Sequence, residues 1–319
     1  MVNGYCISTN NVDVYPQLKK AYAGGIAINV ASYLVRMGEK AAYCGWVGND
    51  ALGKLQLDAL KAEGVDTKYT HVVDVQQDWC NILLEEGNNR VFRDGDGAIA
   101  ATHKFTIEDV KAGQNGEYDF IYSNVECDFE PDAWKQLGET DIPVCYDFST
   151  YWDRFPVNRV EESKGVIDYF YFSLEGREEN PEEFLKECVE KFDAKLALAT
   201  LGTKGSIVYN GRKYYQQKAY LVDAVDTMGA GDMFLSTFTL EYIKGMKELK
   251  KLSEETGWKN TDSIWQEIED RIIERALSRA AMTSAANCMK QGALNRYIDF
   301  EESMVEKSKT SKYAYGKER

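Results

Sequence analysis

Hydrophobic and polar positions follow two spacings in the first part of this chain. Short apolar runs near 5–8 and 41–47 are typical of strands, whereas Ile26, Val30 and Leu34 repeat at the spacing of one helix face. Glycines at 24–25 and 64 mark a helix start and a helix end. The pattern predicts strands at about 5–8, 13–15 and 41–47, and helices at 24–37 and 53–63.

Strand-like and helix-like runs alternate from residue 106 to residue 201. Such alternation implies a parallel sheet covered by helices on both faces, with ligands at the carboxyl ends of the strands. Asn210-Gly211 then predicts a tight hairpin turn. The expected strands are 120–122, 143–147, 169–172, 195–200 and 219–225, and the expected helices lie near 106–113, 131–138 and 181–192.

Residues 68–100 differ in texture, because short apolar runs at 70–73, 79–84 and 90–92 are separated by a turn at 86–89. This pattern predicts a β-meander. Two interpretations remain open: a small separate sheet, or edge strands of the main sheet.

The C-terminal part begins with a charged stretch, 242–262, which we interpret as a surface insertion. A helix is expected from Asp262 or Ser263 to about Met289. The tail, 301–319, mixes Lys and Glu and is expected to be a solvated helix or a frayed end.

Composition excludes several classes of protein. The 319 residues, 44% of them apolar, fit a globular chain of one large α/β domain or two small ones. A net charge of −14 argues against a broad nucleic-acid surface, and no apolar run reaches the roughly 18 residues of a membrane span. The seven cysteines form no C-x-x-C pair, so we expect reduced thiols in a cytoplasmic protein.

The most informative stretch is Asp226–Asp232, which reads Asp-Thr-Met-Gly-Ala-Gly-Asp. It joins an apolar run to a predicted helix, and small residues at such a junction let an anion reach the helix N-terminus. Asp232 falls in the first helical turn, where it could accept the proton of an attacking hydroxyl. The alternative is a tight turn with a capping Asp.

This stretch resembles the second signature of the ribokinase-like (PfkB) family of sugar kinases, whose last Asp is the catalytic base. Gly24-Gly25, Asn29 and the run Gly48-Asn49-Asp50 with Gly53 resemble the first signature of the same family. The two signatures agree with the family in order and distance, and the resemblance extends over residues 5 to 295.

The resemblance implies an α/β fold: a ribokinase-like three-layer sandwich with a mostly parallel central sheet and a small β lid. It implies a single domain over 1–319, with lid strands from about 12–22 and 68–100, and it allows a homodimer through the lid. The implied activity is ATP-dependent phosphorylation of a sugar hydroxyl, with Mg²⁺ and, beside Asp226, a monovalent cation such as K⁺. The implied site residues are Asp232, Gly229, Ala230 and Gly231 for catalysis; Asp13, Gly24, Gly25 and Asn29 for the sugar; and Thr200, Gly202, Gly205, Asp226 and Thr227 for the nucleotide.

One departure leaves the metal ligands unknown. Many family members have Asn-x-x-Glu near magnesium, where this chain reads Ser173-Leu174-Glu175-Gly176. Glu175, Glu178 or water are the candidates to replace it. A second departure is Ser8-Thr9, where the family has Gly.

Within the family, the segment Val12–Leu18 most resembles kinases that phosphorylate the 6-hydroxyl of a fructosamine such as fructoselysine. The acidic segment 126–130 could meet the cationic part of such a substrate. The alternatives are a kinase for fructose, ribose, a nucleoside or a keto-deoxy sugar acid, the last with Arg90 and Arg93 as cationic partners. A non-catalytic sugar-sensing homologue is the alternative of another class.

Overall fold

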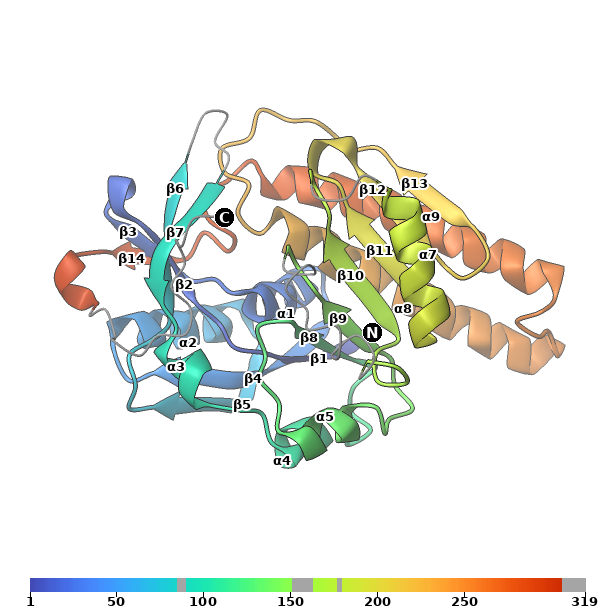
Figure 1. The fold of residues 1–319 in the computed structure, drawn as a ribbon, viewed down its shortest axis with the longest axis horizontal. Helices are drawn as coiled ribbons and strands as arrows, with labels where there is room; N and C mark the ends of the chain where they lie inside the picture. Colours follow the sequence, from blue (N-terminus) through green and yellow to red (C-terminus); the bar gives the residue numbers. More distant parts are fainter. Residues whose placement is uncertain (85–89, 151–162, 177–179, 306–319) are drawn as a thin grey trace.

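The computed structural model describes residues 1–84, 90–150, 163–176 and 180–305. Its centre is a nine-stranded sheet in the order β13-β12-β11-β10-β9-β8-β1-β4-β5, parallel except at the β11–β12–β13 end (Figure 1). The strands are β1 Asn3–Ile7, β4 Lys40–Gly48, β5 Asp66–Val73, β8 Phe120–Asn124, β9 Val144–Asp147, β10 Tyr169–Ser173, β11 Leu196–Thr200, β12 Ser206–Tyr209 and β13 Tyr214–Gln217.

Helices cover both faces of this sheet, which confirms the expected three layers. One face packs against α1, α8 and α9 through a large apolar cluster that includes Phe120, Leu235 and Ile273. The other face packs against α4, α5 and α7. The helices are α1 Ile26–Arg36, α2 Ala51–Glu63, α3 Ala98–Thr102, α4 Ile107–Gly113, α5 Pro131–Leu137, α7 Pro181–Phe192, α8 Ala230–Thr256 and α9 Ser263–Asn287.

A second, five-stranded sheet lies beside the first, in the order β14-β3-β2-β6-β7 (Figure 1, left). Helix α2 lies against it, because Leu52 and Leu55 share an apolar cluster with Val12 and Trp79. Asp50 caps the start of α2 by accepting from the Gly53 N–H, which explains the Asp at this place. The strands are β2 Val12–Tyr15, β3 Lys20–Tyr22, β6 Trp79–Leu84, β7 Arg90–Asp96 and β14 Tyr297–Asp299.

The β-meander prediction is wrong for its first strand. Residues 66–73 form β5, which pairs in parallel with β4 at the edge of the large sheet, while β6 and β7 join the small sheet. Both interpretations of 68–100 therefore hold in part. The turn expected at 86–89 lies outside the described residues.

The strand expected at 219–225 is also absent from the described part of the chain. The turn at Asn210-Gly211 makes Tyr214–Gln217 the returning strand, and the chain leaves the sheet after it. Apolar residues follow, but they are exposed: Tyr220 by 50%, Leu221 by 73% and Val222 by 43%. A run of apolar residues without a partner strand does not form a sheet.

The expected insertion takes a helical form. Helix α8 continues to Thr256, so 242–256 is its second half, and only 257–262 separates it from α9 (Figure 1, right). The tail prediction lies outside the described residues from 306 onward. No helix of the described residues is long and apolar enough to span a membrane.

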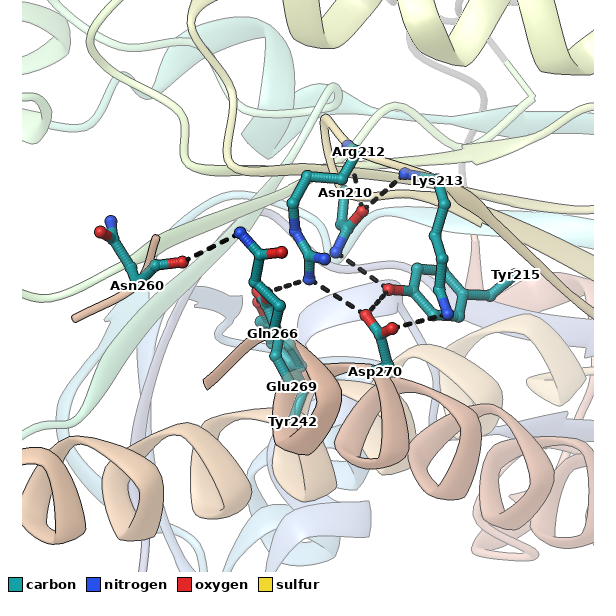
Figure 2. Close-up of polar contacts among 9 residues, drawn as sticks. All are labelled: Asn210, Arg212, Lys213, Tyr215, Tyr242, Asn260, Gln266, Glu269 and Asp270. Carbon is teal, nitrogen blue, oxygen red and sulfur yellow. Dashed lines mark hydrogen bonds and ion pairs between the residues drawn. The ribbon is translucent and has the colours of Figure 1, made fainter. Parts of the chain in front are cut away.

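A polar network fixes the β12–β13 hairpin to α9 (Figure 2). Arg212 pairs with Glu269 at 2.6 Å and with Asp270 at 3.0 Å, and Lys213 pairs with Asp270 at 2.6 Å. The Tyr215 hydroxyl donates to the same Asp270 carboxylate at 2.5 Å. The hairpin edge of the large sheet is thereby held to the helix layer beneath it.

Candidate active site

The Asp226–Asp232 loop leads directly into α8. Gly229 precedes the helix with φ 72°, a backbone conformation that favours glycine, and a Cβ there would lie 2.6 Å from the Tyr33 hydroxyl. A Cβ on Gly231 would meet no atom within 4 Å. Among the described residues no side chain caps α8. The start of the helix thus presents N–H groups beside open space, which suits an anion.

Asp226 holds this loop in place. Its Oδ2 accepts from the Tyr15 hydroxyl at 2.7 Å, Gln291 Nε2 at 2.7 Å and the Gly292 N–H at 2.9 Å, and its Oδ1 accepts from the Met228 N–H at 2.9 Å. A carboxylate has about four acceptor positions. The protein supplies three donors to Oδ2 and one to Oδ1, which gives Asp226 a structural role, and its contact with a cofactor or a monovalent cation stays a prediction.

Asp232 lies in the first turn of α8, as predicted. Its Oδ2 accepts a hydrogen bond from Asn29 Nδ2 at 2.7 Å. Burial raises the pKa of Asp232, while the Asn29 hydrogen bond and the charge of Arg90 oppose that rise. A carboxylate with a raised pKa, held by one amide in the first turn of a helix that no described side chain caps, is suited to accept a proton.

The residues predicted for the sugar come together on the other side of Asn29. Asp13 is 2% exposed, and its Oδ2 has no hydrogen-bond partner among the described residues. Burial, followed by the charges of Asp226 and Asp232, raises the pKa of Asp13 well above its usual range. Asn29 Oδ1 is likewise buried without a described partner. Two neighbouring acceptors are therefore free to meet hydroxyl groups.

The two glycines before α1 permit close packing. A Cβ on Gly24 would lie 2.4 Å from Asp13 Oδ2, and Gly25 has φ 97° with Asn10 Cα 2.9 Å from its Cβ position. The Gln56 side chain makes two hydrogen bonds to the backbone of Gly24, accepting from its N–H at 3.1 Å and donating to its carbonyl at 3.0 Å. Sequence reasoning missed Gln56 and Asn10. A single buried Gln in a helix carries no motif that could have marked it.

The expected nucleotide loop follows β11. Gly202 and Gly205 have φ 57° and 106°, and a Cβ on Gly205 would lie 2.0 Å from the Gln217 carbonyl oxygen. Thr200 ends β11 and donates weakly to the Phe172 carbonyl at 3.4 Å. Thr227 is elsewhere, on the Asp226–Asp232 loop, where its carbonyl and hydroxyl oxygens accept from Arg90.

The fit to a metal ion is limited. The described residues include no group of three or more His, Cys, Asp or Glu side chains that could hold one. Glu175 is exposed and lies against Gly202, where an added Cβ would be 2.0 Å from its Cδ, and Glu178 lies outside the described residues. Mg²⁺ in phosphotransferases is usually held by phosphates and water with one or two carboxylates. The described residues therefore fit a cation that is carried mainly by the phosphates of the nucleotide.

A small acidic pocket adjoins the residues that are predicted to bind the sugar. Its lining includes Asn10, Asn11, Asp78, Asp96 and Glu126. Burial raises the pKa of Asp78 to about 7 and that of Glu126 to about 7. The sequence had marked Glu126 only as part of an acidic segment, and nothing in the spacing linked it to Asp78 or Asp96.

Comparisons with known proteins agree with this geometry. The model of the pfkB family carbohydrate kinases matches residues 5–140 and 172–253. The chain is 32% identical over 240 residues to the fructoselysine 6-kinase of Escherichia coli (strain K12), covering 75% of this chain and 89% of that protein. It is 29% identical over 233 residues to the fructosamine kinase FrlD of Bacillus subtilis (strain 168), covering 73% and 80%.

Solved structures show the same fold at low sequence identity. A fructokinase double mutant from Vibrio cholerae O395, in its fructose, ADP and potassium ion bound form, aligns with a TM-score of 0.69 and 20% identity, covering 93% of this chain and 95% of that one. Ribokinase from Thermotoga maritima aligns with a TM-score of 0.67 and 20% identity, covering 94% and 97%.

Proposed function

Because this chain belongs to the pfkB family of carbohydrate kinases and is an ATP-dependent sugar kinase, we propose that its substrate is a fructosamine such as fructoselysine, phosphorylated at the 6-hydroxyl. The relatives at 32% and 29% identity act, by their names, on fructoselysine and on fructosamines. The observation that carries the proposal is the acidic pocket beside the sugar residues, because a fructosamine differs from fructose by a cationic nitrogen.

We propose the following roles for the sugar and the proton. Asp13 and Asn29 accept hydrogen bonds from substrate hydroxyls, and Asp232 takes the proton of the primary hydroxyl as its oxygen attacks the γ-phosphorus. The N–H groups from Gly229 to Asp232 hold the charge that develops on the phosphoryl oxygens. A divalent cation bound with the nucleotide would neutralise charge on its phosphates.

We further propose where the nucleotide lies. Thr200, Gly202 and Gly205 would border its phosphates and ribose, because these glycines let the backbone approach closely. The exposed apolar segment 220–225 begins just beyond the point where Gly205 contacts β13 and ends at the Asp226–Asp232 loop. An adenine ring needs such an apolar surface, so we assign the base to this segment.

Of the acids in the 126–130 segment, we propose that Glu126 meets the substrate cation. Asp128 pairs with Lys104 at 2.9 Å, and Glu130 is exposed at the start of α5. Glu126 lines the acidic pocket together with Asp78 and Asp96. A cation there would favour the ionised forms of Asp78 and Glu126, so binding of a fructosamine should strengthen as pH rises through about 7.

A sugar acid is the weaker alternative as a substrate. Arg90, one candidate partner for its carboxylate, already donates from Nη1 to Thr227. The acidic lining of the neighbouring pocket would also repel an anion. Fructose and ribose remain the substrates to test against.

The test is a comparison of kcat/KM for fructoselysine, fructose and ribose, with the phosphorylated position read from the product by NMR. We expect fructoselysine to be preferred. Glu126→Gln should raise the KM for fructoselysine by up to about fivefold, the worth of one partly exposed ion pair, and leave that for fructose unchanged. Glu130→Gln is the matched control. Equal use of fructose or ribose would refute the fructosamine proposal while leaving the sugar-kinase activity intact.

A further inference from the structure

Arg90 links the two sheets at the active site. It is the first residue of β7 in the small sheet, yet its Nη1 donates to the Thr227 carbonyl oxygen at 3.0 Å and to the Thr227 hydroxyl at 3.2 Å. Thr227 belongs to the Asp226–Asp232 loop, 137 residues further along the chain. One nitrogen makes both contacts, so most of the guanidinium remains available.

The rest of this guanidinium points to a ligand. A guanidinium carries five N–H donors in a planar fork. Arg90 Nε is buried and has no hydrogen-bond partner among the described residues. Buried polar groups without a partner are uncommon in native proteins, and each one needs an explanation, such as a bound ligand or water. An acceptor brought by a ligand would satisfy Nε.

The charge of Arg90 acts where phosphoryl transfer would occur. It opposes the burial-driven rise in the pKa of both Asp13 and Asp232, so the guanidinium lies near the sugar residues and near the expected base. It also holds the loop whose N–H groups face open space at Gly231. A group bounded by Asp232, Gly231 and Arg90 would be the phosphoryl group itself.

We propose that Arg90 is a catalytic residue, which donates hydrogen bonds from the small sheet to the phosphoryl group during its transfer. This rests on the proposed assignment of Asp232 as the base and of the loop before α8 as the anion site. Planar donors of this kind suit the charge that spreads over the equatorial phosphoryl oxygens.

Arg90 takes no part in the exchange of bonds or in the proton transfer. The oxygen of the sugar hydroxyl forms a bond to the γ-phosphorus as the bond from that phosphorus to the bridging oxygen of ADP breaks, and the hydroxyl proton passes to Asp232. Arg90 stabilises charge and exchanges no proton. Because it comes from the small sheet, its contribution depends on that sheet lying against the loop, which ties the sugar-covering strands to the transfer step.

The test compares Arg90→Ala and Arg90→Lys with Arg93→Ala, an exposed arginine of the same strand. Steady-state kinetics with ATP are measured on fructoselysine and fructose, with circular dichroism as the check on folding. We expect Arg90→Ala to lower kcat by about 10²–10³-fold, the range for losing one charge-stabilising donor. Arg90→Lys should recover only part of this, because a lysine lacks the fork. Arg93→Ala should stay within about threefold.

Two further measurements separate catalysis from structure. Added guanidinium chloride at low millimolar concentration should restore activity to Arg90→Ala and to neither Arg93→Ala nor the wild type. Binding of ADP with aluminium fluoride and sugar should weaken by about 10²-fold in Arg90→Ala, while binding of ADP alone should not change. If Arg90→Ala fails to fold, Arg90→Lys carries the binding comparison.

The proposal is overturned if Arg90→Ala keeps kcat within about threefold, or if only the KM for the sugar rises and guanidinium restores nothing. Asp232→Asn, measured alongside, distinguishes the two levels of inference. A large loss in Asp232→Asn with none in Arg90→Ala removes Arg90 alone. No loss in either variant removes the whole site assignment.

Discussion

Asp226→Asn tests whether the first residue of the Asp226–Asp232 loop has a structural role or binds a cofactor. The four donors to this fully buried carboxylate come from three separate parts of the chain: Tyr15, Met228 and the pair Gln291 and Gly292. An Asn side chain can turn its oxygen toward the three donors of Oδ2. Its NH₂ group would then face the Met228 N–H, donor against donor.

The expected cost follows from those contacts. One hydrogen bond to a charged acceptor is lost, worth about 1.5–3 kcal/mol, and the three that remain lose the benefit of the charge. We therefore expect Asp226→Asn to lower the free energy of unfolding by roughly 2–4 kcal/mol. Urea denaturation followed by tryptophan fluorescence measures it, in the absence of nucleotide and at constant potassium.

A matched control lies three residues away. Asp223 is exposed, so Asp223→Asn should change the free energy of unfolding by less than about 0.5 kcal/mol. A structural role for Asp226 is refuted if Asp226→Asn changes the free energy of unfolding as little as the control does, and instead raises the KM for ATP or abolishes a dependence on K⁺. That outcome would return Asp226 to the cofactor role expected from the sequence.

Four other substitutions probe the loop and the scaffold. Asp232→Asn should leave ATP binding intact and lower kcat by about 10²–10⁴-fold. Because burial raises the pKa of Asp232, the kcat/KM of the wild type should fall on acidification at a higher pH than an ordinary carboxyl would give. Gly231→Val should abolish turnover with a Tm near that of the wild type, since a Cβ at this position would contact no other atom within 4 Å. Gly229→Val should prevent folding, because a Cβ there would clash with Tyr33 and Ala293. Unchanged turnover in Gly231→Val would refute the anion site. Desolvation alone would raise the pKa of Asp270, but hydrogen bonds from Lys213, Tyr215 and Arg212 lower it, so its folded-state pKa lies below the unfolded one. The stabilisation by Asp270 should be present above the unfolded pKa and vanish as pH falls through the folded one, so Asp270→Asn should lower Tm at pH 7 and lower it less as the medium is acidified.

Local signals in the sequence were enough for most of the fold. The 3.6-residue period before Arg36 and the alternating runs after residue 106 depend on neighbours in the chain, and α1, α4, α5 and α7 lie where these patterns predicted them. The error at 66–73 has a different origin. Whether a strand joins the large or the small sheet depends on its partner, and period alone does not name the partner.

The candidate site residues fall into the same two groups, those marked by a local motif and those defined by contacts with distant parts of the chain. Asp232, Asn29 and Asp13 could be named as candidates because their motifs resemble those of a known family. Gln56 could not, because its importance comes from two hydrogen bonds to Gly24 across a gap of 32 residues. Asp226 was marked by its motif, but its three donors from distant segments, Tyr15, Gln291 and Gly292, cannot be seen in a linear pattern.

Three contacts join the N-terminal third of the chain to the loop before α8, and together they constrain how the enzyme can work. Tyr15 donates to Asp226, Asn29 donates to Asp232, and Arg90 donates to Thr227. Each partner on the N-terminal side also belongs to, or lies beside, the proposed sugar site. A sugar that shifts the small sheet must therefore shift donors to the loop that is proposed to hold the phosphoryl group. Sugar binding and phosphoryl transfer would then be coupled through these hydrogen bonds, without any need for a separate allosteric element.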